Sequence, residues 1–449
     1  MRSSVAIIGA GFSGTLTAIQ LAHTASTSTE IDIYLIDPRE SFGPGLAYTP
    51  PSKGFKLNVP AKSMGAFPDD VEGFYRWIYE RDRSISPEDF APRLLYGAYL
   101  EDLLNQASSR STGHTIHRVR DEVINLRQTS SPEKWELTLN SGSSLVVDAC
   151  VLAMGNLMPT APATSKTPLE FRQPFSSSSY DDLSSRQKIF ILGSSLTAVD
   201  VILECEARGF TGSYTVLSRN GRFPRPHESL PSSAVAHLPH DWDTRGSARS
   251  LTSLIRAESR RLGSSQPVFD AMRPKIQSMW KHLPPSERKR FLRHVRPIWD
   301  IHRHRIPASH ADVLARLQAT NRLRIIAGRL RTFDTSSSKI SCVISKRGQP
   351  LSASIEGPFD VAFRCTGPEG DITKSDHPLL RNLHATGLLL PGPLGLGPLC
   401  ATSDTVPLWL VGPLQREVLW EITAVREIRE HAHEVARQVV RHLEKTPTA

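Results

Sequence analysis

The segment Val5-Ala6-Ile7-Ile8-Gly9-Ala10-Gly11-Phe12-Ser13-Gly14 decides the fold of this 449-residue chain. Its four apolar residues predict a buried strand, and its three glycines predict a tight turn into a helix. Gly9 permits the turn, Gly11 lets a ligand approach the backbone, and Gly14 lets helix and strand pack closely. Because the amide groups at a helix N-terminus bind anions, this segment predicts a site for the pyrophosphate of a dinucleotide.

The residues that follow complete a βαβ unit, with a helix expected over 12–23 and a strand over 31–36. That strand ends at Asp37, 23 residues after Gly14, close to the spacing of about 20 expected for an acid that binds ribose. An acid suits a free 2′-hydroxyl, as on FAD or NAD, and repels a 2′-phosphate. The alternative is a glycine-rich turn without a ligand. Three adjoining residues are expected to contact the same cofactor: Phe12, Ser13 and Pro38.

A second strand-glycine-helix motif begins at Gly193, 184 residues after Gly9. It reads Ile189-Phe190-Ile191-Leu192-Gly193-Ser194-Ser195-Leu196-Thr197-Ala198, so Ser195 replaces the second glycine and obstructs close backbone approach. The next strand ends at Ser218-Arg219, where an arginine can accept a 2′-phosphate. The two motifs together predict FAD at the first and NADPH at the second. A second motif that no longer binds a nucleotide is the alternative.

Two further apolar strands end in glycine, at Gly155 and Gly367, and each follows one of the glycine motifs in order. In flavoproteins with two dinucleotides the chain crosses between domains after such strands, close to the cofactor. We therefore expect an α/β, two-dinucleotide-binding-domain flavoprotein, with a Rossmann-like FAD domain that contains an inserted Rossmann-like NAD(P) domain. The expected ranges are 1–160 and 323–449 for the FAD domain, 186–322 for the NAD(P) domain, about 226–310 for a helical insertion within it, 158–187 for a linker rich in Pro and Ser, and 416–444 for a C-terminal helix.

Charge and cysteine content narrow the classes of function. The net charge is +9, and residues 249–305 carry 14 Lys and Arg against four Asp and Glu. This basic stretch suits an anionic substrate or cofactor, or a solvated helical face, and the lack of a known motif argues against nucleic acid. The five cysteines include no C-x-x-C pair and no zinc-ligand spacing, which argues against a redox disulfide and a bound metal. Without a segment that suits a signal peptide or a bilayer span, we expect a cytoplasmic protein without a membrane partner, whose oligomeric state stays open.

Several longer motifs are more specific than either glycine pattern. They are Gly45-Leu-Ala-Tyr48, Leu57-Asn-Val-Pro-Ala61, Phe90-Ala-Pro-Arg93, Tyr96-Gly-Ala-Tyr99, Ser218-Arg-Asn-Gly221 with Pro224 and His227, Trp299-Asp-Ile-His-Arg-His-Arg305, and Trp420-Glu-Ile-Thr-Ala424 with Glu427-Ile-Arg429. On these motifs the chain resembles, over nearly its full length, the YdhS-like FAD/NAD(P)-binding proteins, which are related to class B flavin-dependent monooxygenases. The resemblance implies that the segment from Asn58 to Met64 lies along the flavin ring. It also implies that Arg93 lies near the FAD phosphates or ring, and the turn at Gly412 near the far end of the flavin.

The stretch His302-Arg303-His304-Arg305 is the main candidate for chemistry beyond nucleotide binding. An arginine here could clamp the NADPH phosphates or an anionic substrate, and a histidine could relay protons. We select His302 and Arg305 as catalytic candidates, together with Lys62, whose cation would stabilise a peroxide anion at the flavin. The alternative is a basic surface run that pairs with acids of the insertion.

These features predict an FAD-dependent NADPH oxidoreductase, in which NADPH reduces FAD and a small-molecule substrate is hydroxylated through a peroxyflavin. Two alternatives stay open. One is an NAD(P)H-dependent flavin reductase that passes electrons to an acceptor other than oxygen. The other is a non-catalytic FAD-containing binding protein that uses its basic insertion to bind a partner.

Overall fold

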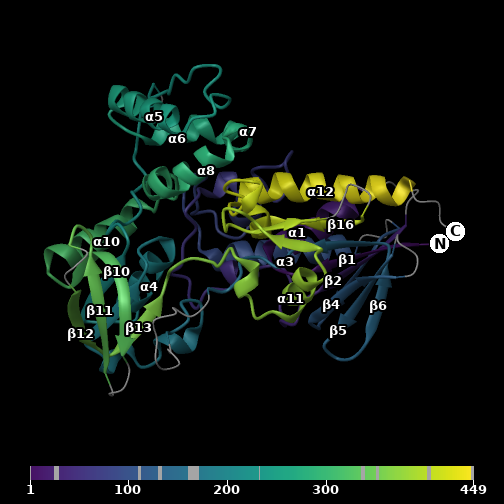
Figure 1. Cartoon of the computed structure of the whole chain (residues 1–449), viewed down its shortest axis with the longest axis horizontal. Coiled ribbons are helices and arrows are strands. Elements are labelled where there is room, and N and C mark those ends of the chain that lie inside the picture. Colours follow the sequence, from purple (N-terminus) through teal and green to yellow (C-terminus); the bar gives the residue numbers. More distant parts are fainter. Residues whose placement is uncertain are drawn as a thin grey trace. The chain divides into compact units, whose positions relative to one another are not determined.

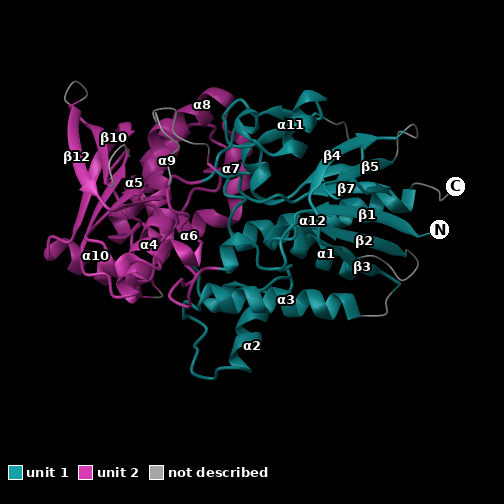
Figure 2. Ribbon diagram, turned by 90° about the horizontal axis from the view of Figure 1, so that it is seen from below, with its two compact units in different colours: residues 1–49, 59–158, 368–449 teal, residues 50–58, 159–367 magenta. Residues whose placement is uncertain are grey.

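The chain divides into two compact units, which Figure 2 shows in separate colours. Unit 1 comprises residues 1–49, 59–158 and 368–449, and unit 2 comprises residues 50–58 and 159–367. The structure is a computed structural model that describes residues 2–24, 30–109, 113–129, 134–159, 171–231, 233–334, 339–349, 353–401 and 406–445. Part of the expected linker, residues 160–170, lies outside the described residues.

A five-stranded parallel sheet forms the centre of unit 1, in the order β16-β7-β1-β2-β3. Its strands are β1 (Ser3–Ile8), β2 (Ile31–Ile36), β3 (Thr115–Val119), β7 (Ala149–Leu152) and β16 (Leu408–Leu410). Helix α1 (Phe12–Thr24) connects β1 to β2, which confirms the predicted strand, helix and strand of the first motif. Because all five strands run in the same direction, their carboxyl ends share one edge, which is where ligands bind in such sheets.

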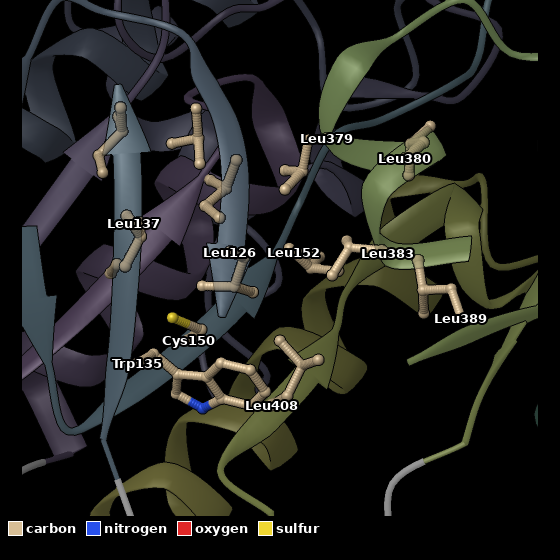
Figure 3. Close-up of a cluster of buried hydrophobic side chains, with 14 of the residues drawn as sticks. Leu126, Trp135, Leu137, Cys150, Leu152, Leu379, Leu380, Leu383, Leu389 and Leu408 are labelled. Atoms are coloured by element: carbon tan, nitrogen blue, oxygen red, sulfur yellow. The ribbon is translucent and has the colours of Figure 1, made fainter. Parts of the chain in front are cut away.

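The core of unit 1 fills the space between this sheet and a three-stranded antiparallel sheet. The smaller sheet consists of β4 (Val123–Gln128), β5 (Trp135–Leu139) and β6 (Ser144–Val147). Alternation along β1 directs Ala6 and Ile8 into this core, where they join Trp135 and Leu137 of β5. Helix α11 (Pro378–Ala385) closes the cluster with leucines, as Figure 3 shows. This packing fixes β7, whose end carries Gly155.

Helices complete unit 1. Helix α1 packs against α3 (Arg93–Ser109) and α12 (Val425–Lys445), and Figure 1 shows α12 lying along α1. The predicted C-terminal helix over 416–444 is wrong at its start, because a 3-10 turn occupies Gly412–Glu417 and α12 begins only at Val425. Glu421 between them has φ 62°, a left-handed conformation that an α-helix cannot contain. The remaining short elements are α2 (Gly73–Tyr79), β14 (Leu389–Pro391), β15 (Pro398–Cys400) and 3-10 turns, including Leu46–Tyr48 and Ala61–Ser63.

Unit 2 contains a six-stranded sheet in the order β12-β11-β10-β9-β8-β13. Its strands are β8 (Lys188–Leu192), β9 (Ser213–Ser218), β10 (Leu323–Asp334), β11 (Ile340–Lys346), β12 (Ala353–Phe359) and β13 (Val361–Arg364), with helices α4 (Leu196–Ala207) and α10 (Ala308–Ala319). Residues from 323 onward were expected in the FAD domain, and the strand pairing corrects this. Strand β10 lies parallel to β9, and β13 lies parallel to β8, so the chain returns to unit 1 only at residue 368.

The basic stretch of unit 2 folds into short helices, as predicted. They are α5 (Ala248–Leu262), α6 (Gln266–Met272), α7 (Ile276–His282), α8 (Pro285–Arg290) and α9 (Arg296–Arg303), with a π-helical turn at Phe291–Val295 between the last two. Buried aromatic rings hold them together, since Phe291 packs edge-on against both Trp280 and Trp299. Three acids of the insertion, Glu258, Glu287 and Asp300, pair with arginines one helical turn away. No helix in the described part of the chain is long and apolar enough to cross a membrane.

Candidate functional site

The turn after β1 is built so tightly that two of its glycines are required by the protein itself. Gly9 has φ 104°, and a Cβ there would lie 2.5 Å from the carbonyl oxygen of Ala153. A Cβ at Gly14 would lie 1.8 Å from the carbonyl oxygen of Gly9. Any side chain at either position would collide with backbone, so these glycines keep β1, β7 and α1 at their observed separation.

Gly11 differs from both of these glycines. A Cβ added there would meet only the Cα of Gly45 at 3.5 Å and Nη2 of Arg39 at 3.6 Å, which are ordinary van der Waals contacts. Its backbone is also outside the left-handed region, so the fold does not require glycine at this position. Since the fold does not need this glycine, the lack of a side chain fits a close approach of a dinucleotide pyrophosphate to the backbone at the N-terminus of α1.

Asp37 lies beside this turn and is only 4% exposed. Its carboxylate accepts hydrogen bonds from the backbone amide of Ala10 at 2.8 Å and from the Arg39 guanidinium at 2.7 and 2.8 Å. Burial alone would raise the pKa of Asp37, but the hydrogen bonds from Arg39 and Ala10 outweigh it and hold the pKa below its ordinary value. A ribose hydroxyl at Asp37 would therefore share the carboxylate with Arg39, a residue that the sequence analysis did not select.

The turn after β16 meets the same glycine motif. A Cβ at Gly412 would lie 2.2 Å from Oγ of Ser13, so these two predicted cofactor residues are in direct contact. A small cavity of about 10 Å³ opens nearby in unit 1, lined by residues that include Gly155, Leu157, Leu396, Pro413, Leu414 and Arg416. The predicted residues Gly155 and Gly412 thus border one region at the carboxyl edge of the parallel sheet.

The other predicted residues of unit 1 lie on short elements beside this sheet. Met64 is 2% exposed, and Arg93 is the first residue of α3. Lys62 lies in the 3-10 turn Ala61–Ser63, and its Nζ pairs with Glu88 at 2.5 Å. Because a carboxylate already neutralises Lys62, its predicted action on a developing anion requires this pair to open.

The second glycine motif repeats the geometry of the first. A Cβ at Gly193 would lie 2.0 Å from the carbonyl oxygen of Cys365, two residues before Gly367, just as Gly9 meets Ala153, two residues before Gly155. In each unit, therefore, the first glycine of the motif packs against the strand that ends in a closing glycine. The two predicted nucleotide turns share one local structure.

The residues around the second turn gather where β8 and β9 end. Oγ of Ser194 donates a hydrogen bond to the carbonyl oxygen of Arg222 at 2.6 Å, and it lies 2.8 Å from Oγ of Ser218, whose hydroxyl can donate to it. Ser195 is exposed at the N-cap of α4, where its side chain makes no capping hydrogen bond to the described residues. The side chain of Arg219 is exposed at the end of β9. This edge therefore presents two hydroxyl groups and a cation next to a helix N-terminus.

The stretch 302–305 lies within the insertion, tied to the segment that follows β9. The amide of Arg225 donates to the carbonyl of Ile301 at 2.8 Å, and that of His227 donates to the carbonyl of Ile306 at 2.8 Å. Nδ1 of His302 lies 2.7 Å from Oγ of Ser265. Helix α9 ends at Arg303, so His302 is the second-last residue of the helix and His304 follows its end.

Two neighbours of this stretch were not identified from the sequence as site residues. Nε2 of His227 lies 3.0 Å from the carbonyl oxygen of Asn58, a predicted flavin-facing residue that belongs to unit 2. Asp270 of α6 accepts a hydrogen bond from Arg305 at 2.5 Å. Both partners are far from the stretch in sequence, so only the tertiary fold reveals them.

His302 should be neutral at pH 7, because burial, Arg225 and Arg305 all lower its pKa from 6.5. We expect its NMR titration midpoint to lie below 6.5, and Arg225→Gln to raise it. Since the unfolded chain binds this proton first, the contribution of His302 to stability falls as the pH drops from about 6.5 through the folded pKa. Arg245→Gln, which removes an exposed arginine of the same insertion, is the control and should not move the midpoint. A midpoint at or above 6.5 in the wild type would contradict this assignment.

Glu417 holds the loop that lines the cavity of unit 1. It is 4% exposed, and its carboxylate accepts hydrogen bonds from the amides of Leu394 at 2.9 Å and Leu396 at 3.1 Å. Glu417→Ala leaves both amides without this acceptor and should lower the free energy of unfolding by about 2–4 kcal/mol. Urea denaturation measures the change, with the exposed Glu430→Ala as a control expected within about 0.5 kcal/mol. Equal losses of unfolding free energy in the two variants would show that Glu417 does not hold this loop.

One family model matches the first part of the chain. Residues 6–157 match the FAD-NAD(P)-binding family model. This range contains the first glycine motif, the turn after β2 and the closing glycine of β7. No curated protein sequence matches the chain significantly.

Solved structures resemble the whole chain. Ornithine hydroxylase from Pseudomonas aeruginosa, in its reduced form, has 15% identity and a TM-score of 0.66, with 99% of this chain and 100% of that chain covered. The ornithine N-hydroxylase of Kutzneria sp. 744 with reduced FAD, NADP⁺ and L-ornithine has 12% identity and a TM-score of 0.65, with 99% of each chain covered. A bacillithiol disulfide reductase from Bacillus cereus has 13% identity and a TM-score of 0.53, covering 98% of this chain and 99% of that chain. At these identities the likeness establishes the fold alone, and it confirms the predicted α/β, Rossmann-like architecture.

Proposed function

We propose that the protein is an FAD-dependent NADPH monooxygenase that hydroxylates a small molecule. The observation that carries the proposal is the whole-length likeness to two ornithine hydroxylases, at TM-scores of 0.66 and 0.65, against 0.53 for a disulfide reductase. The match of residues 6–157 to the FAD-NAD(P)-binding model supports FAD at the first motif, as does Gly11, a glycine that the packing of the protein does not require. The finer assignment that we propose is the YdhS-like family, on the motifs quoted from the sequence.

When bound, FAD would accept hydride from NADPH and activate dioxygen. The chain's own part is to hold the two nucleotides. In unit 1 the N-terminus of α1 would bind the pyrophosphate at Gly11 and Ser13, and Asp37 would orient the ribose. In unit 2 the hydroxyls of Ser194 and Ser195 and the cation of Arg219 would hold NADPH at the N-terminus of α4.

We propose amines as the first substrate class to test, because both hydroxylases above act on ornithine by their names. A neutral imidazole is the form of histidine that accepts a proton. His302 therefore could take a proton from an ammonium group, which makes the nitrogen lone pair available for hydroxylation.

The thiols bear on the reductase alternative. None of the five cysteines forms a disulfide within the described part of the chain, and four of them are buried. Burial raises the pKa of Cys150 and Cys365 well above the ordinary value of a thiol, which keeps both protonated and unreactive at neutral pH. Electrons that reach a flavin here would therefore leave to an external acceptor rather than to a dithiol of the protein.

The test begins with the purified protein and its flavin spectrum. NADPH and NADH are titrated anaerobically, and oxygen is then admitted in the presence of a panel of diamines and basic amino acids. The proposal expects flavin reduction by NADPH and oxygen consumption matched by hydroxylated product. Hydrogen peroxide alone, with equal turnover on a quinone under nitrogen, would favour a flavin reductase instead. Bound FAD without any NADPH oxidation would overturn both activities.

A further inference from the structure

A buried arginine in the insertion has more donors than the protein satisfies. Arg305 is 5% exposed, and its Nε and Nη1 are buried without a hydrogen-bond partner among the described residues. A buried guanidinium is stable only when acceptors replace the water that it has lost. Two unsatisfied donors on one charged group therefore indicate a place where another acceptor binds.

The third nitrogen of Arg305 pairs with a carboxylate that lies at the surface. Nη2 donates to Oδ1 of Asp270 at 2.5 Å, and the Asp270 side chain is 54% exposed while that of Arg305 is 6% exposed. Asp270 thus covers the guanidinium on the side that faces water. A half-exposed carboxylate loses little when it returns to solvent, so an incoming anion can exchange with it.

Charged groups of both signs lie around Arg305. Arg303 is also buried, at 8% exposure, and it opposes the charge on Arg305. Burial, followed by Arg303, lowers the pKa of Arg305, whereas Asp270 and Glu228 act in the opposite direction. These two carboxylates already oppose the two arginines, so the case for a further acceptor rests on the two unsatisfied donor atoms of Arg305.

We propose that Arg305 anchors a binding site for a small oxyanion, a carboxylate or a phosphate, which enters by displacing Asp270. The planar guanidinium would offer Nε and one Nη to the two oxygens of the anion in a bidentate pair. The oxyanion belongs either to the substrate or to the nicotinamide nucleotide. This identification of the ligand rests on the proposed function.

The experiment compares Asp270→Asn with Asp241→Asn in the full-length flavoprotein. Asp241 pairs with Arg245 on the exposed surface of the same insertion, so the control changes the net charge equally. Both substitutions alter partly exposed side chains, which leaves the fold intact. Dissociation constants are measured by calorimetry for acetate, inorganic phosphate, NADPH and NADH at constant ionic strength, without turnover.

If an anion displaces Asp270, Asp270→Asn should lower the dissociation constant of at least one oxyanion about tenfold. Asp241→Asn should change none of these constants by more than about twofold. A gain for acetate alone assigns the site to a substrate carboxylate, and a gain for NADPH but not NADH assigns it to the 2′-phosphate. Adding Arg305→Gln to Asp270→Asn should remove the gain. Unchanged constants in Asp270→Asn, or a gain that survives Arg305→Gln, would overturn the site. Neither result depends on whether the enzyme hydroxylates anything, so a failed monooxygenase assay leaves this test intact.

Discussion

Gly11→Ala should weaken FAD binding about 100-fold while the apoprotein stays as stable as the wild type within about 1 kcal/mol. The protein can accept the methyl group, because its nearest neighbours would be the Cα of Gly45 at 3.5 Å and Nη2 of Arg39 at 3.6 Å. The ligand cannot, since the methyl group occupies the place where a pyrophosphate meets the N-terminus of α1. FAD titration into the apoprotein, followed by flavin fluorescence, measures the affinity, and urea denaturation measures the stability.

Gly14→Ala is the matched control, because the methyl group added there would clash with the protein backbone and not with the ligand. Its Cβ would lie 1.8 Å from the carbonyl oxygen of Gly9, so the apoprotein should lose about 3 kcal/mol or more. The pair of variants separates the two roles that glycine has in one motif. If Gly11→Ala bound FAD like the wild type, the first motif would not be the pyrophosphate site.

The parts of the fold that the sequence predicted are those fixed by local geometry. A four-residue apolar strand that turns at a glycine into a helix has one favourable packing, which is why both turns and both following helices lie where they were expected. The repetition extends to the closing strands, where Ala153 and Cys365 hold equivalent positions against Gly9 and Gly193. Short-range spacing sufficed for these elements.

The features that the sequence missed depend on partners far along the chain. The boundary at 322 was wrong because the sequence of β10 does not show which sheet this strand joins. Only its pairing with β9 places it in unit 2. The role of Glu417 was not predicted from the sequence, because it depends on the amides of Leu394 and Leu396, 23 and 21 residues earlier. The role of Asp270 follows only from its hydrogen bond with Arg305, 35 residues away. The periodicity of a sequence does not predict contacts between such distant residues.

Arg219→Ala should raise the dissociation constant of NADPH about 10- to 100-fold and leave that of NADH nearly unchanged. Arg219 is exposed at the end of β9, beside Ser218 and the N-terminus of α4, so its guanidinium is available to a 2′-phosphate. An ion pair with phosphate contributes more than a neutral hydrogen bond, and NADH lacks this phosphate. Anaerobic flavin reduction at varied NADPH and NADH concentrations gives both constants.

Arg324→Ala provides the control for general charge. Arg324 is also an exposed arginine of unit 2, but it lies opposite Thr215 near the start of the parallel strands and pairs with Glu356. It should change neither constant, because nucleotides bind at the carboxyl edge of such a sheet. Ser195→Gly then tests whether the serine side chain hinders the backbone approach, in which case both nucleotides should bind more tightly. If Arg219→Ala left the ratio of the two constants unchanged, the second motif would not read the 2′-phosphate, and the preference for NADPH would have to come from another cation of unit 2.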